Sequence, residues 1–154
     1  MPAAMHSYYL RHMYINNDLV KPDVLAVDGV PLDLGKIEIP LYIIATREDH
    51  IAPWRSVYAL TQLAGGATTF RLANSGHIAG IVNPPGNKKA QYWASDAKPP
   101  DPEAWREDAA LREGSWWPDW YEWLGAQSGK RVAPPEMKAE NALASAPGTY
   151  VLEK

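Results

Sequence analysis

Residues 39–46 read IPLYIIAT and residues 68–72 read TTFRL, and these two segments decide the fold. The first is a continuous apolar run, which is typical of a strand buried on both faces, as in a parallel sheet. The second alternates like another strand. Between them, Pro53 and apolar residues at helical spacing predict a helix that stops at Gly65-Gly66. A strand–helix–strand unit of this kind predicts an α/β sheet.

A shorter apolar region precedes this unit. Residues 6–19 place apolar side chains at the spacing of a short amphipathic helix. Residues 24–32 hold apolar segments on both sides of Asp28-Gly29, a dipeptide typical of two-residue hairpin turns. Pro31 has no N–H for a ladder hydrogen bond, so its strand is expected at an edge. We therefore expect a helix and a small hairpin before the first long strand.

The region after the unit is rich in proline and tryptophan. The prolines predict extended loop over much of residues 83–102, and we expect an extended tail over residues 133–154. Asp101-Pro102 is typical of a helix start, and this helix is expected to continue to about Leu111. Trp117-Pro118 predicts a further helix. One face of that helix gathers Trp116, Trp120 and Trp123, with Trp117, Tyr121 and Leu124 beside them.

Length and composition limit the class of protein. The chain has 154 residues, which suits one domain or a piece of a larger one, and 46% of them are hydrophobic. A net charge of −3 provides no basic field for nucleic acid or an anionic membrane. The sequence shows neither a membrane-spanning apolar run nor the regions of a signal peptide, so we expect a cytoplasmic protein. The chain has no cysteine, which excludes disulfides and a cysteine nucleophile on this chain.

One acid and one imidazole follow the two predicted strands. Asp49 comes after residues 39–46, and His77 comes after residues 68–72. Reactive groups in open α/β sheets gather beyond the carboxyl ends of the strands, so we expect these side chains to meet. An aspartate that accepts the Nδ1–H of a histidine leaves Nε2 free to act as a base. Taken separately, the aspartate also fits a turn or N-cap and the histidine a structural role.

The neighbouring polar residues allow weaker interpretations. His50 adjoins Asp49 and is a candidate for a supporting hydrogen-bond donor, although an ordinary loop histidine also fits. Glu48 with Asp49 and the two histidines could supply metal ligands, but their spacing matches no compact ligand motif, and we expect no metal. The pair also lacks a nucleophile, because no serine lies in a G-x-S-x-G turn. Too few residues precede Asp49 to complete such a sheet, so we expect a C-terminal piece.

Three motifs carry a family resemblance. Residues 47–54 read REDHIAPW, residues 75–85 read SGHIAGIVNPP and residues 114–120 read GSWWPDW. In this order they resemble the polyhydroxyalkanoate synthases, and most closely the class I poly(3-hydroxybutyrate) polymerases. The resemblance runs from about Met5 to Val151. It implies an α/β-hydrolase fold, of which this chain would be the C-terminal portion.

The resemblance also implies an activity and a division of the chain. Members of the family join (R)-3-hydroxyacyl groups from coenzyme A thioesters into polyester and release coenzyme A, with no cofactor. Asp49 and His77 correspond to the catalytic acid and histidine, whereas the family's nucleophile is a cysteine that this chain lacks. The isolated chain is therefore expected to be inactive. The implied divisions are the end of a cap region and hairpin at 1–38, the catalytic domain at 39–130 and the tail at 131–154.

Several partners remain open on the sequence alone. The chain could take part in a homodimer or bind a synthase subunit, and the family resemblance suggests association with polyester granules. The Trp-rich helix fits core packing, a subunit interface or a platform for polyester. The alternative function is accordingly a non-catalytic module that binds a synthase subunit or granule through this face. Lys88-Lys89 with Tyr92-Trp93 could contact coenzyme A phosphates or nucleic-acid bases, but an ordinary solvated loop is expected.

Overall fold

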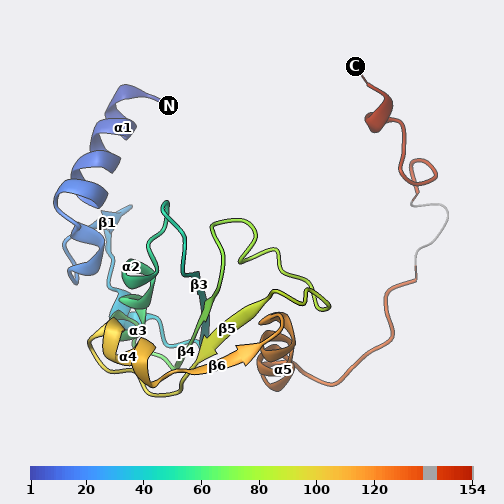
Figure 1. Ribbon diagram of the computed structural model, residues 1–154. Coiled ribbons are helices and arrows are strands. Elements are labelled where there is room, and N and C mark those ends of the chain that lie inside the picture. The colour runs from blue at the N-terminus through green and yellow to red at the C-terminus, as the bar shows by residue number, and fades with distance from the viewer. Residues whose placement is uncertain (137–141, 154) are drawn as a thin grey trace.

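A four-stranded sheet forms the centre of the computed structural model, which describes residues 1–136 and 142–153 (Figure 1). Its strands lie side by side in chain order: β3 (Leu41–Thr46), β4 (Thr68–Ala73), β5 (Gln91–Ala94) and β6 (Ala110–Glu113). Strands β3 and β4 are parallel, whereas β5 and β6 are added antiparallel. The α/β class is confirmed, but the expectation of parallel late strands holds only for β3 and β4.

The remaining elements precede this sheet, lie against it or follow it in the C-terminal tail. They are α1 (Ala3–Tyr9), the π-helical segment η1 (Leu10–Ile15), the 3₁₀ turn η2 (Asp18–Val20), β1 (Ala26–Val27), β2 (Val30–Pro31), the 3₁₀ turn η3 (Leu34–Lys36), α2 (Trp54–Tyr58), α3 (Leu60–Leu63), α4 (Pro102–Asp108), α5 (Trp117–Gln127) and the 3₁₀ turn η5 (Tyr150–Leu152). None of the helices in the described part of the chain has the length and apolar character needed to cross a membrane.

The parallel pair β3–β4 buries one face against α2 and α4. Six consecutive residues of each strand pair in register, from Leu41 opposite Thr68 to Thr46 opposite Ala73. Alternate side chains then point to the same face, where Phe70 packs edge-on against Trp105 with ring centroids 4.7 Å apart. This face forms the main core: Ile43, Ala45, Trp54, Tyr58, Phe70, Leu72, Trp93, Trp105 and Ala109. The strand–helix–strand prediction is therefore confirmed, with the helix divided into α2 and α3.

The opposite face of the sheet is covered by α5. Tyr42 of β3 points to this face, and its ring lies 6.1 Å from the Trp116 ring and 5.5 Å from the Trp123 ring. The Tyr42 hydroxyl donates to Asp119 Oδ1 at 2.7 Å, and Arg71 Nε of β4 donates to the same oxygen at 3.0 Å. The helix predicted from Trp117-Pro118 is confirmed. Its first turn is joined to both parallel strands.

One expectation for the region after β4 was confirmed and one was wrong. Much of residues 83–102 is loop, as expected, although the segment also contains β5, in which Trp93 pairs with Leu72 and is buried in the core. The helix expected to reach Leu111 ends at Asp108, since Leu111 pairs with Trp93 in β6. Prolines stand on both sides of β5, at positions 84, 85, 99 and 100, and none lies within it. At the end of α4, pairing with the distant strand β5 overrides the local helix signal.

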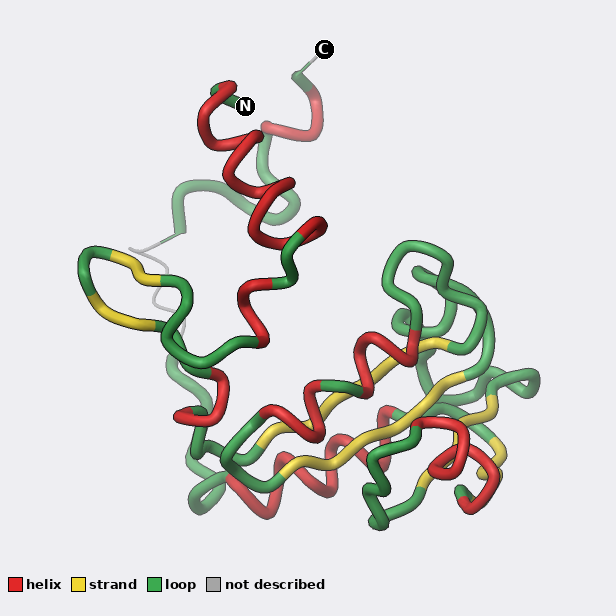
Figure 2. Tube along the Cα trace, turned by 90° about the vertical axis from the view of Figure 1, so that its left-hand side faces the viewer, coloured by secondary structure: helices red, strands yellow, loops and turns green. Residues whose placement is uncertain are grey.

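The N-terminal elements extend away from the sheet (Figure 2). The helix predicted over 6–19 is present but begins at Ala3 and ends at Ile15, and its first seven residues include no buried side chain. The hairpin is confirmed, with Val27 opposite Val30. Both residues of its turn, Asp28 (φ 50°) and Gly29 (φ 79°), have the left-handed backbone that this two-residue turn requires.

The C-terminal tail contains one short regular element. The expected extended tail, 133–154, is interrupted by the 3₁₀ turn Tyr150–Leu152. The expectation for positions 137–141 and 154 lies outside the described residues. Elsewhere in the tail, nearly all of the described residues are exposed.

Candidate active site

The loops after β3 and β4 run side by side because the parallel pairing continues beyond the strands. Arg47 donates its backbone N–H to Ala73 O at 2.9 Å, and Glu48 donates to Ser75 O at 3.0 Å. Ser75 has a left-handed backbone (φ 72°), which turns the second loop at this point. These bonds bring Asp49 and His77, which follow Glu48 and Ser75, to the same edge of the sheet.

Asp49 and His77 meet at this edge. His77 Nδ1 lies 2.8 Å from Asp49 Oδ2, so the contact expected from the two strand ends is present. Asp49 Oδ1 accepts hydrogen bonds from the backbone N–H groups of Ile51 at 2.8 Å and Ala52 at 2.9 Å. The Asp49 side chain is only 7% exposed, whereas that of His77 is 47% exposed. The carboxylate is thus held by the protein, and the imidazole faces solvent.

The surroundings of Asp49 favour its charged form. The N–H of Ala52 contributes most to lowering the pKa of Asp49 to about 2, with help from His77 and Ile51, while burial opposes them. An ionised Asp49 accepts a hydrogen bond from Nδ1–H and so selects the His77 tautomer with Nε2 unprotonated. No residue in the described part of the chain forms a hydrogen bond with Nε2. This nitrogen is available to take a proton.

A hydrogen-bonded turn carries His77. Gly80 donates its N–H to Gly76 O at 3.0 Å, and Val82 donates to Ile78 O at 2.8 Å. Gly80 lies against β3 so closely that an added Cβ would be 2.8 Å from Thr46 Cβ and 2.8 Å from Asn74 O. Only glycine fits this approach, although sequence reasoning gave Gly80 no role. The motif itself, with glycines at 76 and 80 around the histidine, was the available signal.

Sequence reasoning also missed three donors at the start of α5. Trp116 Nε1 donates to Gly80 O at 2.9 Å, and Trp117 Nε1 donates to Ile81 O at 3.0 Å. The Ser115 hydroxyl donates to Asn83 O. The prediction for the Trp-rich face considered packing and binding, and it did not include hydrogen bonds to the histidine turn. We call the side chains of Ser115, Trp116 and Trp117 the carbonyl clamp.

Other candidate residues do not join the pair. His50 is exposed, and its ring forms no hydrogen bond with any described residue. Within residues 1–136 and 142–153, no three His, Cys, Asp or Glu side chains gather as metal ligands. Lys88 and Lys89 are exposed loop residues, as expected, but Tyr92 and Trp93 belong to β5 and not to the same loop.

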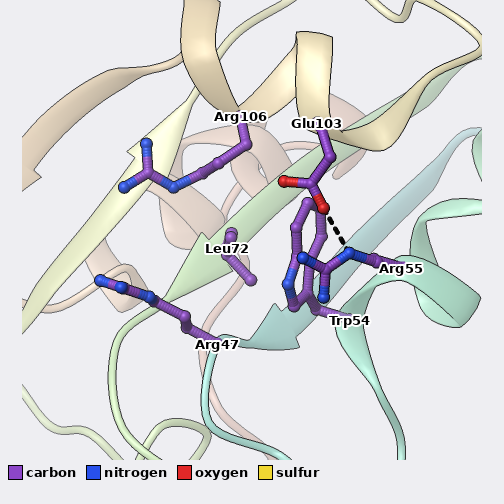
Figure 3. Close-up of a pocket in the computed structure, with 6 residues that line it drawn as sticks. All are labelled: Arg47, Trp54, Arg55, Leu72, Glu103 and Arg106. Atoms are coloured by element: carbon purple, nitrogen blue, oxygen red, sulfur yellow. Dashed lines mark hydrogen bonds and ion pairs between the residues drawn. The ribbon is translucent and has the colours of Figure 1, made fainter.

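A separate cavity of about 220 Å³ lies on the core side of the sheet (Figure 3). It is lined by Arg47, Trp54, Arg55, Leu72, Glu103 and Arg106. Arg55 is paired with Glu103, while Arg106 and Arg47 lie over the Trp93 ring at 3.9 Å and 5.6 Å. Burial, and then the charge of Arg47, lowers the pKa of Arg106. Neither Asp49 nor His77 lines this cavity, so it is distinct from the acid–histidine pair.

Known proteins match the whole chain. The poly(3-hydroxyalkanoate) polymerase subunit PhaC of Cupriavidus necator is 46% identical over 157 residues. Poly(3-hydroxyalkanoate) polymerase 2 of Ectopseudomonas oleovorans and the polymerase of Methylorubrum extorquens are each 48% identical over 158 residues. The chain belongs to the poly(3-hydroxyalkanoate) polymerase family. The resemblance stated from its three motifs is confirmed.

The match covers only part of each polymerase. This chain spans 27% of the C. necator polymerase, 28% of the E. oleovorans polymerase and 26% of the M. extorquens polymerase. It corresponds to the C-terminal part of these polymerases. No protein-family model matches the chain.

Proposed function

We propose that this chain supplies the acid and the base of a polyhydroxyalkanoate polymerase, with Asp49 orienting His77. The reaction joins (R)-3-hydroxyacyl groups from coenzyme A thioesters into polyester and releases coenzyme A. The observation that carries the proposal is the 2.8 Å contact between His77 Nδ1 and Asp49 Oδ2 in a chain that matches polymerases over its full length. The proposed reaction uses no resident cofactor or metal ion.

Asp49 and His77 divide the work between them. Asp49 keeps the proton on Nδ1 and stabilises the imidazolium that forms when Nε2 takes a second proton. Four hydrogen bonds hold the carboxylate, two from backbone N–H groups, one from His77 and one from the Thr46 hydroxyl at 3.4 Å, so it does not need to reorganise during the reaction. The exposed position of His77 lets a thiol or hydroxyl from outside this chain reach Nε2.

The cysteine nucleophile comes from residues outside this chain, which contains no cysteine. Nε2 of His77 takes the thiol proton, and the thiolate attacks the thioester carbonyl to form an acyl-enzyme. The departing coenzyme A thiolate takes the proton back from His77. In elongation, Nε2 takes the proton from a 3-hydroxyl group, whose oxygen attacks the acyl-enzyme, and the regenerated thiolate recovers that proton.

The same proposal includes the domain and its setting. Residues 39–130 form the C-terminal portion of an α/β-hydrolase domain, residues 1–38 the end of its cap region and hairpin, and residues 131–154 a tail. The acid and the histidine follow neighbouring parallel strands, which fits that fold. Among the described strands, β3 pairs only with β4, so its other side is open to a further strand. The enzyme works in the cytoplasm at the surface of polyester granules.

A chimeric polymerase tests the catalytic roles. This chain replaces the matching C-terminal quarter of the C. necator polymerase, and release of coenzyme A from (R)-3-hydroxybutyryl-CoA is followed with a thiol reagent. We expect an active chimera in which His77→Gln and Asp49→Asn each lower kcat by about 10²–10⁴-fold. His50→Gln is the matched control and keeps the activity. An active chimera that tolerates His77→Gln would refute the proposal.

The alternative binding module is supported less well. Two rings of the Trp-rich face, those of Trp116 and Trp123, pack against Tyr42 of the sheet and are therefore not free to bind a partner. Tyr121 and Leu124 are the members of that face that remain exposed. Size-exclusion chromatography of the chain with the intact C. necator polymerase distinguishes the two functions, since only the binding module predicts a stable complex.

A further inference from the structure

We propose that the carbonyl clamp is a positioning device that holds the His77 turn in hydrogen-bond reach of Asp49. The clamp consists of the side chains of Ser115, Trp116 and Trp117 bound to the carbonyls of Gly80, Ile81 and Asn83. Its catalytic importance rests on the proposed function, whereas its effect on the geometry of His77 does not.

The first argument concerns the carbonyl groups at the end of the turn. A single hydrogen-bonded turn has few bonds of its own to fix its position. Of the three carbonyls bound by the clamp, only that of Ile81 also accepts a bond from within the segment, from the N–H of Asn83 at 3.0 Å. Gly80 and Asn83 are buried, which keeps water from their surroundings. Buried carbonyls are nearly always hydrogen-bonded, and here the donors come from the side chains of the clamp. The clamp therefore completes the hydrogen bonding of the histidine turn.

The second argument is that the turn has little side-chain packing to hold it. Ile78 is 73% exposed and Val82 is 63% exposed, so these large apolar residues do not anchor the segment. The fixed points are the backbone of Gly80 against Thr46, the carbonyls bound by the clamp and the buried side chain of Asn83 at the end of the segment. His77 thus depends mainly on contacts of the main chain around it for its position.

The third argument is that the clamp and Asp49 share one reference strand. The Trp116 ring is stacked on Tyr42 of β3, with 26° between the ring planes. Asp119, two residues after the clamp, accepts hydrogen bonds from Tyr42 and from Arg71 of β4. Asp49 follows the carboxyl end of β3. The imidazole and the carboxylate are consequently both placed relative to β3, the first through the clamp and the second through its own loop.

Nuclear magnetic resonance of this chain tests the geometry without any activity. Trp116→Phe and Trp117→Phe each remove one indole N–H, and Trp120→Phe is the control. Trp120 lies on the same helix, and its indole donates no hydrogen bond to the described residues. Long-range ¹H–¹⁵N spectra report which nitrogen of His77 carries the proton. The unmodified chain and Trp120→Phe should show only the Nδ1–H tautomer, with a strongly downfield proton, and the two clamp variants should show mixed tautomers and lose that proton signal.

The outcomes separate the clamp from general packing. A folded Trp116→Phe or Trp117→Phe variant that keeps the His77 spectrum of the unmodified chain overturns the proposal, and so does an equal change in Trp120→Phe. If a clamp variant loses its folded-state spectrum, 3-benzothienylalanine is placed at the same position. That side chain keeps the bicyclic shape and replaces the N–H by sulfur, so a retained His77 spectrum again overturns the proposal, and mixed tautomers support it.

The chimeric polymerase then links this geometry to turnover. Small displacements of a catalytic group cost up to about 100-fold in rate, so each clamp variant should lower kcat by about 10–100-fold with KM changed by less than about threefold. A clamp variant with mixed tautomers and unchanged kcat overturns the catalytic part of the proposal. An inactive unmodified chimera counts against the proposed function alone, because the tautomer measurement still decides whether the clamp holds His77.

Discussion

Replacing Gly80 by alanine should separate the histidine turn from β3. The new Cβ would lie 2.8 Å from Thr46 Cβ and 2.8 Å from Asn74 O, and closer still to Thr46 Cγ2. Carbon atoms pack best at about 3.5–4.0 Å, so the methyl group would sit roughly 1 Å too close to Thr46 Cβ. Because Thr46 belongs to the sheet and Asn74 O to the backbone, neither yields easily.

The expected cost follows from this crowding. Overpacked sites lose about 1–3 kcal/mol of unfolding free energy. Close contacts with three atoms at once place Gly80→Ala at the upper end of this range, at about 3 kcal/mol. In a chain of about 150 residues each kcal/mol lowers Tm by about 2–4 °C, so the variant should melt about 6–12 °C below the unmodified chain. Differential scanning calorimetry and urea unfolding measure both quantities.

Gly125→Ala is the matched control for the same substitution. Gly125 lies within α5, where an added Cβ meets no atom within 4 Å. Alanine is the better helix former, so this variant should gain about 0.5–1 kcal/mol. Equal stability of Gly80→Ala and the unmodified chain would show that the turn is free to move away from Thr46, and the argument for a fixed histidine position would fail.

Three further predictions concern single interactions. The pKa of Asp49 is lowered from 3.8 to about 2, so the contribution of its charged form to stability is complete above pH 4 and is lost as the pH falls towards 2. The difference in urea midpoint between the unmodified chain and Asp49→Asn should therefore narrow over this pH range. A constant difference would contradict the lowered pKa of Asp49. Tyr42→Phe removes a hydrogen bond to a carboxylate and should cost about 1.5–3 kcal/mol in urea unfolding, against no measurable loss for exposed Tyr121→Phe. Trp105→Ala should lower the free energy of unfolding by about 3–5 kcal/mol. Trp105→Phe should lower it by less than half as much, because the buried indole N–H of Trp105 makes no hydrogen bond that could be lost. Equal losses for the two variants in thermal unfolding would refute this.

The central unit and the acid–histidine contact could be predicted from local sequence. An apolar run, a helix start at Pro53 and an alternating segment are signals within short windows, and the parallel pairing follows from them. Asp49 and His77 each come directly after a strand, so their meeting depends only on both strands ending at one edge. Their catalytic roles, in contrast, stay a prediction.

The features that sequence reasoning missed depend on distant backbone contacts. Strand β5 is short and has prolines on both sides, and it is defined by the pairing of Trp93 with Leu72 of β4 and with Leu111 of β6. The indole N–H groups of Trp116 and Trp117 bind main-chain carbonyls about thirty-six residues away. Every residue has a backbone carbonyl, so the residue types at positions 80 and 81 do not predict these hydrogen bonds.

The carbonyl clamp binds only the backbone of the histidine turn, so side chains of this turn can be changed without removing its hydrogen bonds. Its donors contact the backbone at Gly80, Ile81 and Asn83, and the side chains of Ile78 and Val82 remain directed to solvent. Positions 78 and 82 can therefore be randomised in a mutant library without changing the partners of the indole groups. The N–H of Val82 bonds to Ile78 O within the turn that carries His77, so a library at these two positions varies the surface of this turn while the clamp that holds it is kept.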